Sequence, residues 1–277
     1  MYDKFQLGLK YLRYYLAASD GKGHGMHSPF VFEFITKVLN DKTNYPAYSQ
    51  VENLRQQLLK DQTILIVEDF GAGSSVDKTS QRSIASITKN AAKPAKFGQL
   101  LYRMVRYYQP KSILELGTSL GMTTSYLSLG KPDSKIITME GAKSIAETAR
   151  KNFKILNLHN ISIEEGNFDQ TLSSAISQLS SIDLAFIDGN HRREPTERYF
   201  NQFLTLTHTD SILIFDDIHW SPDMEQAWEA IQDHPAVRCT IDLFFVGVIL
   251  FRKEFKENQH FKIRFSSTMG NIQRIII

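Results

Sequence analysis

Five short apolar runs recur along the second half of this chain at nearly regular intervals. They cover residues 112–116, 135–139, 161–164, 182–187 and 211–215, so that each starts 21 to 29 residues after the one before. Helical patterns lie between the first four runs, and another precedes the fifth. This alternation is typical of β-strands joined by helices, which build a parallel sheet with helices on both faces. We therefore expect an α/β fold with a doubly wound, mostly parallel sheet.

The two ends of the chain complete this picture. Residues 236–253 hold two apolar runs with a turn between them, which predicts a hairpin at the sheet edge and a total of seven strands. A further strand-like piece, HFKIRF, follows in the tail. Residues 1–92 are mostly helical in pattern. We expect them to form an N-terminal helical cap, and residues 93–277 to form the main domain.

The composition excludes some classes of function. The net charge is only +2, and no block of like charge stands out, so nucleic acid is a poor candidate partner. A single cysteine, Cys239, rules out an internal disulfide and suits a reducing compartment. No continuous apolar run reaches the roughly 18 residues of a membrane span. We therefore expect a cytoplasmic protein that binds no membrane.

The first helix carries apolar residues at a helical spacing. Phe5, Leu9, Leu12 and Leu16 fall on one face of a helix over residues 1–19. We expect this face to pack on the body of the protein, and a helix lying on a membrane surface is the alternative.

Two stretches resemble the start of a nucleotide-binding unit, in which a strand runs into a glycine loop. The first, ILIVEDFGAGSS at residues 64–75, is followed by neither a helix of the right length nor a second parallel strand within about 30 residues. The second, SILELGTSLGMTT at residues 112–124, is followed by a helix, a strand and the acidic residue Glu140. Context therefore favours the second loop, with Glu140 placed to accept hydrogen bonds from a ribose.

The second loop is not built for a pyrophosphate. Its glycines, Gly117 and Gly121, are spaced Gly-x-x-x-Gly, which breaks the dinucleotide fingerprint. The carboxylate of Glu115, just ahead of them, would repel a phosphate. It suits instead a cationic ligand that carries an ammonium and a sulfonium group.

These residues resemble a known family. LELGTSLGMTTSYLS and IITMEG are similar to the first two motifs of class I S-adenosylmethionine-dependent methyltransferases, which have a Rossmann-like sheet. KFGQLLYRMVRYYQPKSILELGT, DLAFIDGNH and ILIFDDIHW together resemble the catechol and caffeoyl-coenzyme A O-methyltransferase group. The resemblance covers roughly residues 94–253. It implies methyl transfer from S-adenosylmethionine to a small hydroxylated acceptor, assisted by Mg²⁺.

The resemblance also implies roles for individual residues in cofactor binding. Glu140 would hold the ribose, and Asn167 and Phe168 would lie against the adenine. The methionine end of the cofactor would be surrounded by the residues of the second loop and its flanks. The implied cofactor-binding set is Glu115, Gly117, Ser119, Gly121, Thr123, Glu140, Asn167, Phe168 and Asp188.

Three acids take the metal-ligand positions of the family. Asp188 ends one predicted strand, and Asp216 and Asp217 end the next, so their carboxylates can converge at one rim of the sheet. Carboxylates that converge in a cleft repel one another, and a hard divalent cation such as Mg²⁺ relieves that repulsion. Asp217 departs from the family, which has Asn at that position. His191 stands where the family has its catalytic lysine, and together with Asp188 it is the predicted catalytic pair, with His191 accepting the proton of the acceptor.

Other functions remain open at this point. The methyl acceptor could be a nitrogen, or the reaction could need no metal. GTSLG also matches the nucleophile elbow of a serine hydrolase, with Ser119 as nucleophile and with Asp188 or Asp216 followed by His219 in the right chain order. A protein that binds the cofactor without catalysis is a further possibility, and a homodimer is plausible.

The pair His24 and His27 could suggest a metal site, but no third ligand lies in reach. A role in a loop or a helix cap is the expectation for this pair. A contribution of this stretch to the acceptor pocket is the alternative.

Overall fold

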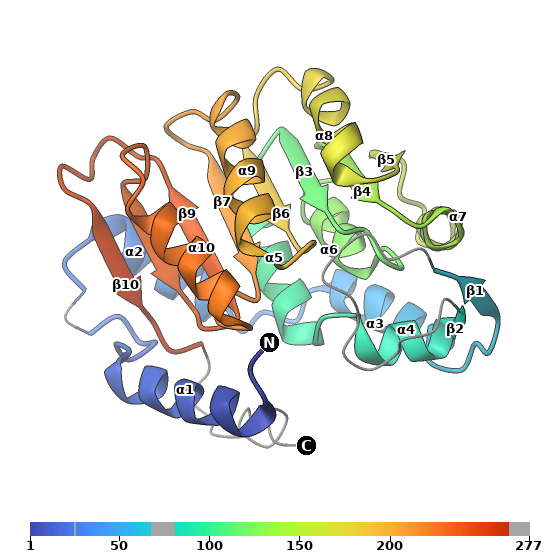
Figure 1. The fold of residues 1–277 in the computed structure, drawn as a ribbon, viewed down its shortest axis with the longest axis horizontal. Coiled ribbons are helices and arrows are strands. Elements are labelled where there is room, and N and C mark those ends of the chain that lie inside the picture. The colour runs from blue at the N-terminus through green and yellow to red at the C-terminus, as the bar shows by residue number, and fades with distance from the viewer. Residues whose placement is uncertain (25, 68–80, 266–277) are drawn as a thin grey trace. The chain divides into compact units, whose positions relative to one another are not determined.

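The computed structural model describes residues 1–24, 26–67 and 81–265. Over these residues the chain forms an eight-stranded sheet in the order β10-β8-β9-β7-β6-β3-β4-β5, flanked by helices (Figure 1). The predicted α/β fold with a mostly parallel sheet is confirmed. The five regularly spaced runs are strands β3 (Ser112–Leu116), β4 (Lys135–Glu140), β5 (Ile161–Glu165), β6 (Leu184–Ile187) and β7 (Ile212–Asp216).

The C-terminal strands differ from the prediction in one respect. The hairpin forms from β8 (Cys239–Asp242) and β9 (Val246–Leu250), and β9 pairs antiparallel with β7. The hairpin is not the sheet edge, however, because β10 (Gln259–Lys262) pairs in parallel with β8 on its outer side. The sheet therefore has eight strands rather than seven, and the HFKIRF piece supplies the additional one.

The contacts divide the chain into two compact units, and the division falls within β6. Residues 42–184 form what we call the central unit, and residues 1–41 together with 185–277 form the terminal unit. This division differs from a boundary at residue 92. Residues 1–41 contact the C-terminal third of the chain, whereas residues 42–92 belong with the strands and helices that follow them.

Close helix packing organises the central unit. Gly98 on α5 and Gly130 on α6 allow these helices to approach, since a Cβ at Gly98 would lie 2.3 Å from the Tyr126 ring and one at Gly130 would lie 2.8 Å from Val105. The buried Tyr126 hydroxyl donates a 2.9 Å hydrogen bond to Glu52 on α3. The helices of this unit are α3 (Pro46–Leu58), α4 (Ile84–Asn90), α5 (Ala95–Tyr108), α6 (Met122–Gly130), α7 (Lys143–Ile155) and α8 (Phe168–Ser177).

The first of the two glycine loops also belongs to the central unit. The strand before it is present as β1 (Ile64–Ile66), but it pairs only with β2 (Gln81–Ser83), as an antiparallel two-stranded ribbon. It therefore takes no part in the main sheet, as its sequence context indicated. The glycine loop itself, residues 70–75, lies outside the described residues.

The terminal unit brings the first helices to the last strands of the chain. Helix α1, blue in Figure 1, lies beside the strands drawn in orange and red, and its Tyr14 hydroxyl donates to the backbone carbonyl of Asp242 at 3.0 Å. Ser28 caps α2, and Pro29 lies in its first turn. The helices of this unit are α1 (Lys4–Ala17), α2 (Pro29–Glu33), the π-helix η1 (Phe34–Leu39), α9 (Arg193–Leu204) and α10 (Pro222–Gln232). None of the helices in the described ranges combines the length and apolar composition that a bilayer span demands.

The face of α1 that packs on the body is not the predicted one. Leu7, Tyr11 and Tyr14 are buried, and together with Phe244 they form a small apolar cluster. The predicted set points outward instead, and its four side chains are Phe5, Leu9, Leu12 and Leu16. Both faces are apolar enough to pack. The tyrosine face has the additional advantage that the Tyr14 hydroxyl finds buried backbone carbonyls to bond.

Candidate functional site

The second glycine loop follows β3 and begins α6. Gly117 and Gly121 both have positive φ values, of 97° and 78°. A Cβ at Gly121 would lie 2.4 Å from the Phe153 ring on α7, so glycine is required there both by the backbone conformation and by the space. Ser119 between them also has a positive φ, of 47°, which is unusual for a residue with a side chain. Strain of this kind is typical of ligand-binding loops.

Glu140 ties this loop to the end of β4. One carboxylate oxygen accepts a hydrogen bond from the backbone N–H of Ser119 at 2.8 Å, and the other accepts from the backbone N–H of Ala142 at 3.0 Å. The side chain is half-buried. The sequence predicted that Glu140 and the loop at residues 117–121 serve one site, and the structure brings the two together.

Glu115 lies deeper, inside β3, and its side chain is fully buried. Its carboxylate accepts hydrogen bonds from the hydroxyl of Thr138 on β4, at 2.7 Å, and from the hydroxyl of Thr124 on α6. Burying a carboxyl group is costly unless its oxygens accept hydrogen bonds, and the two hydroxyls supply such bonds beneath the loop. Glu115 is therefore placed to attract a cationic ligand across the loop rather than to contact that ligand directly.

The remaining cofactor candidates of the central unit lie at the neighbouring strand ends. Asn167 caps α8 through its side chain, and Phe168 begins that helix and is half-buried. The backbone N–H of Gly166, just before them, donates to the carbonyl of Glu140 at 2.9 Å. Thr123 is half-buried in the first turn of α6. Because β3, β4 and β5 are parallel neighbours, all these residues follow the carboxyl ends of adjacent strands, where ligands bind in such sheets.

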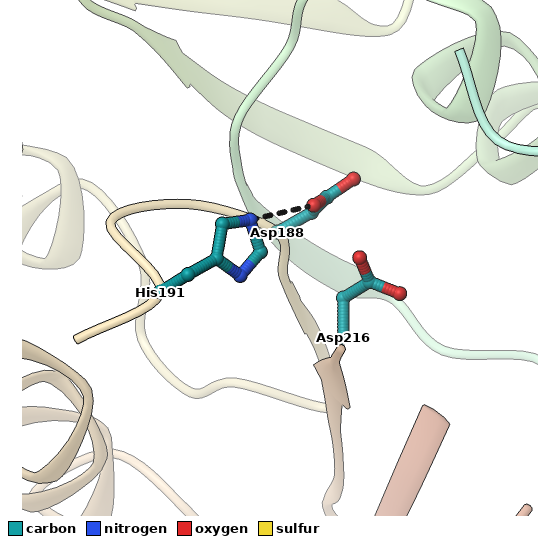
Figure 2. Close-up of side chains that lie close together, drawn as sticks. All are labelled: Asp188, His191 and Asp216. Atoms are coloured by element: carbon teal, nitrogen blue, oxygen red, sulfur yellow. Dashed lines mark ion pairs between the residues drawn. The ribbon is translucent and has the colours of Figure 1, made fainter. Parts of the chain in front are cut away.

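A second group of polar side chains lies in the terminal unit, and we call it the Asp–His cluster. It consists of Asp188, which follows β6, His191 in the next loop, and Asp216, which ends β7. One ligand atom from each of the three lies within 4.8 Å of the others. Figure 2 shows the ion pair from His191 Nε2 to Asp188 Oδ1, which measures 3.5 Å, and the Asp216 carboxylate beside it. Asp216 is buried, whereas Asp188 and His191 are half-buried, so the cluster can be reached from one side.

Asp217 is not a member of this cluster. Its φ is 54°, and its backbone N–H donates to the carbonyl of Phe245 at 2.7 Å, which fixes the chain just after Asp216 in a tight turn. Asn190 and His191 also have positive φ values, of 67° and 24°. Of the seven non-glycine residues with positive φ in the described ranges, three therefore lie in the cluster or next to one of its members. Such strain is consistent with a functional site at this position.

A partly buried ionic network next to this turn was not anticipated from the sequence. His219 bonds Asp242 through Nε2 at 2.9 Å and Glu225 through Nδ1 at 3.0 Å. Glu225 also accepts from Lys10 at 2.8 Å and from the Tyr2 hydroxyl at 2.6 Å, so the network anchors α1. These partners are up to 223 residues apart in the chain, and no local pattern signals them.

The network shifts the pKa values of its members. Burial favours the neutral imidazole of His219, but the hydrogen bonds to Asp242 and Glu225 outweigh it and raise the pKa to about 9. Burial acts to raise the pKa of Glu225, whereas the hydrogen bonds from His219, Lys10 and Tyr2 prevail and lower it to about 2. His219 is therefore protonated at neutral pH, and both its nitrogens are bonded to carboxylates. An imidazole in this state is unsuited to act as the general base for Ser119, which weakens the hydrolase alternative.

The two N-terminal histidines lie away from the Asp–His cluster. His24 is exposed and pairs with Asp20 at 3.1 Å. His27 lines a separate pocket of about 860 Å³ along β10, together with Phe30, Phe255 and His260. Among the described residues, the Asp–His cluster is the metal-like group of three or more ligands, and neither His24 nor His27 belongs to it.

Comparison with known proteins shows what this chain resembles. Residues 114–218 match the family model of a methyltransferase domain. The resemblance to methyltransferases is thereby confirmed. The matched span begins in β3 and ends just after β7, so it includes the second glycine loop, Glu140 and the Asp–His cluster.

Individual proteins agree with this match. A catechol O-methyltransferase of Niastella koreensis is 27% identical over 124 residues, which is 44% of this chain and 55% of that protein. The chain spans about half the length of the curated relatives it matches. A methyltransferase of Podospora anserina bound to S-adenosylhomocysteine superposes with a TM-score of 0.55 at 14% identity, over 82% of this chain and 97% of that one. The O-methyltransferase TomG of Streptomyces achromogenes, in complex with S-adenosylmethionine, gives 0.54 at 17% identity, over 80% and 95%. These structures establish the shared fold.

Proposed function

We propose that this protein transfers the methyl group of S-adenosylmethionine to the oxygen of a small hydroxylated acceptor, with the help of a divalent metal ion such as Mg²⁺. The observation that carries the proposal is the bond between the Glu140 carboxylate and the Ser119 N–H, which unites a strained glycine loop with an acid at the next strand end. The methyltransferase match over residues 114–218 supports the same reading.

In the central unit, each residue has a task that suits its environment. The two Glu140 oxygens accept backbone hydrogen bonds from Ser119 and Ala142, and a carboxylate, which has about four acceptor sites and no donor, suits the two hydroxyls of a ribose. Glu115, buried below the loop, favours the sulfonium and ammonium charges at the methionine end. Asn167 and Phe168 would lie against the adenine. Gly117 and Gly121 let the backbone approach the ligand closely.

The reaction itself is an in-line displacement. The acceptor oxygen bonds to the methyl carbon while the carbon–sulfur bond breaks, and the electron pair stays on the sulfur of S-adenosylhomocysteine. His191 takes the proton of the acceptor hydroxyl on the ring nitrogen that does not face Asp188. The Asp188 carboxylate, 3.5 Å from the other nitrogen, then stabilises the imidazolium that forms. Alignment of the two reactants lowers the barrier further, because the entropy cost of bringing them together is met on binding.

The Asp–His cluster has a donor set that fits a divalent cation. Two carboxylates and an imidazole within 4.8 Å of one another can each supply one ligand atom. Mg²⁺ favours the oxygens of Asp188 and Asp216, whereas Mn²⁺ accepts the imidazole as well. When bound, such an ion would lower the pKa of the acceptor hydroxyl and fix its direction.

Calorimetry tests the cofactor first. S-adenosylmethionine and S-adenosylhomocysteine are titrated into the protein with added Mg²⁺, with Mn²⁺ and with a chelator. We expect binding of both compounds in all three conditions, because the cofactor residues named in the central unit include no metal ligand. If neither compound released or absorbed heat, S-adenosylmethionine would not be the cofactor and the proposal would be wrong.

An acceptor screen tests the chemistry. Hydroxylated aromatic compounds and the matching amines are compared by the release of S-adenosylhomocysteine. Turnover of hydroxyls that stops with the chelator supports the proposal as stated. Turnover of amines points to N-methylation, turnover that survives the chelator points to a metal-independent enzyme, and binding without any turnover points to a non-catalytic protein.

A further inference from the structure

Helix α1 presents a line of large apolar side chains to solvent. Phe5 is 81% exposed, Leu16 72%, Leu9 42% and Leu12 39%, and we call these four residues the outward stripe. One exposed leucine is ordinary on a protein surface, but four aligned on a single helix form a contiguous patch of the kind that marks an interaction site.

The opposite face of α1 is held firmly, so the stripe cannot turn inward. Leu7, Tyr11 and Tyr14 pack against Phe244, and the Tyr11 and Phe244 rings meet edge to face at 4.9 Å. Lys10 adds the ion pair with Glu225. Among the described residues, α1 therefore packs through its tyrosine face and leaves the outward stripe exposed.

The spacing within the stripe indicates what it contacts. The four residues are separated by four, three and four positions, which places them at alternating a and d positions of a heptad. They span only a narrow seam on the helix, as helix–helix contacts do, rather than the broad apolar face of a helix that lies in a bilayer. The stripe therefore fits another helix.

The order of these spacings reads the same in both directions. An antiparallel copy of α1 would place Phe5 opposite the partner's Leu16 and Leu9 opposite the partner's Leu12. The flanking positions on one side are Gln6 and Arg13, which could then face each other, so no like charges meet across the seam. A surface that complements itself in this way is the mark of a two-fold contact.

We propose that the outward stripe of α1 is the contact between two copies of this chain. Charge argues against an anionic membrane as the occupant. Of the three cations on α1, Lys10 is bound to Glu225, and Arg13 alone adjoins the stripe, whereas lipid-binding segments carry about four to eight basic residues. A seam of four side chains per copy is small beside the roughly 800 Å² per partner of a standard interface, so we expect a weak dimer that forms only at high protein concentration.

Sedimentation equilibrium over about 2 to 300 µM tests this proposal. We expect the weight-average mass of the unmodified protein to rise from that of one chain towards that of two. The double variant Leu9→Glu/Leu12→Glu should bind its copy at least about tenfold more weakly, because each glutamate would have to be buried in the seam. Ala17→Glu is the matched control, since Ala17 is exposed on the same helix but off the stripe, and it should associate like the unmodified protein.

Thermal unfolding at low concentration separates loss of contact from loss of fold. All three proteins should unfold within about 2 °C of one another, because the altered side chains are exposed in the single chain. If the double variant is less stable than that, Phe5→Ser/Leu16→Ser replaces it, and the same loss of association is expected.

Two results would overturn the proposal. One is that the protein stays monomeric at about 300 µM. In that case, co-sedimentation with vesicles of anionic lipid would show whether the stripe binds a membrane instead. The other is a double variant that associates as strongly as the unmodified protein, which would place any dimer contact elsewhere.

Discussion

The carboxylate of Glu140 accepts a 2.8 Å hydrogen bond from the backbone N–H of Ser119, a residue of the glycine loop 21 positions earlier in the chain. This bond fixes the distance between the loop and the acid at the end of β4. In the proposed function, both then contact the same cofactor. The loop conformation and the position of the acid are therefore one structural unit, and disturbing either should weaken the binding of S-adenosylmethionine.

Replacing Glu140 tests that unit directly. Glu140→Gln retains the shape, but its amide group can accept only one of the two backbone hydrogen bonds and turns a donor towards the other. We expect S-adenosylmethionine to bind about 10- to 100-fold more weakly, the range for losing charged hydrogen bonds. Calorimetry measures it, and Glu147→Gln, an exposed acid on α7 of the same unit, is the control. Unchanged affinity in Glu140→Gln would remove residue 140 from the site.

Gly121→Ala should damage the loop through the fold. The new Cβ would lie 2.4 Å from the Phe153 ring, and the φ of 78° would be strained as well. We expect a loss of about 2–4 kcal/mol in the free energy of unfolding by urea. The additional substitution Phe153→Leu removes the ring that the new Cβ would contact. It should recover part of the lost stability, whereas the backbone strain at residue 121 would stay. Full recovery of the unfolding free energy would mean that the backbone strain at residue 121 costs nothing. No recovery would mean that the Phe153 ring does not cause the loss.

The Asp–His cluster makes a prediction about metal binding that separates two neighbouring acids. Asp216 belongs to the cluster, whereas Asp217 does not, although the sequence predicted both as ligands. We expect Asp216→Asn to weaken Mn²⁺ binding at least about tenfold and Asp217→Asn to change it by less than about threefold. Electron paramagnetic resonance of free Mn²⁺ measures both without any need for catalysis. Equal losses in the two variants would restore Asp217 as a ligand.

His191 can be tested apart from the metal. His191→Ala should lower the turnover number by about 10²- to 10⁴-fold if it accepts the acceptor proton, with little effect on the binding of S-adenosylmethionine. The exposed His159 offers a matched control as His159→Ala. A loss of Mg²⁺ affinity together with the loss of turnover would make His191 a metal ligand instead of the base, because Mg²⁺ favours the oxygens of Asp188 and Asp216.

The framework of this site was predictable because it follows from strand ends. Of the strands from β3 to β7, all but the edge strand β5 are largely buried and apolar. Polar residues stand at their ends, such as Glu140 as the last residue of β4 and Asp188 directly after β6. In a parallel sheet such positions lie along the same edge, whatever the length or packing of the helices that connect the strands. Edge strand β10 was harder to place, because its residues QHFK alternate between half-buried and exposed and its pairing depends on β8 alone.

Features decided by geometry across long distances could not be predicted. A helical period shows that Phe5 and Leu9 share a face, but it does not tell which of two apolar faces docks, and Tyr14 decided that by bonding distant carbonyls. The exclusion of Asp217 from the cluster depends on its φ of 54°, which no residue pattern signals.

The ionic network of His219 carries the last prediction, which concerns stability and pH. The pKa of His219 is raised to about 9 in the folded state from about 6.5, so the network stabilises the fold fully below pH 6.5 and loses this contribution as the pH rises through about 9. The pKa of Glu225 is lowered to about 2, so its contribution is present above about pH 4.5 and is lost as the pH falls through about 2. Both contributions are complete between about pH 4.5 and 6.5.

Urea unfolding of the unmodified protein and of His219→Gln, measured from pH 5 to 10, tests this window. The difference in unfolding free energy should be on the order of 3 kcal/mol near pH 6 and should shrink steadily towards pH 10, because a shift of about 2.5 pKa units corresponds to that energy. His159→Gln, at an exposed position, should show a small difference that does not change with pH. A difference between the unmodified protein and His219→Gln that stays constant from pH 6 to 10 would mean that His219 acts by packing against Phe244, whose ring centroid lies 5.1 Å away, and not by its charge.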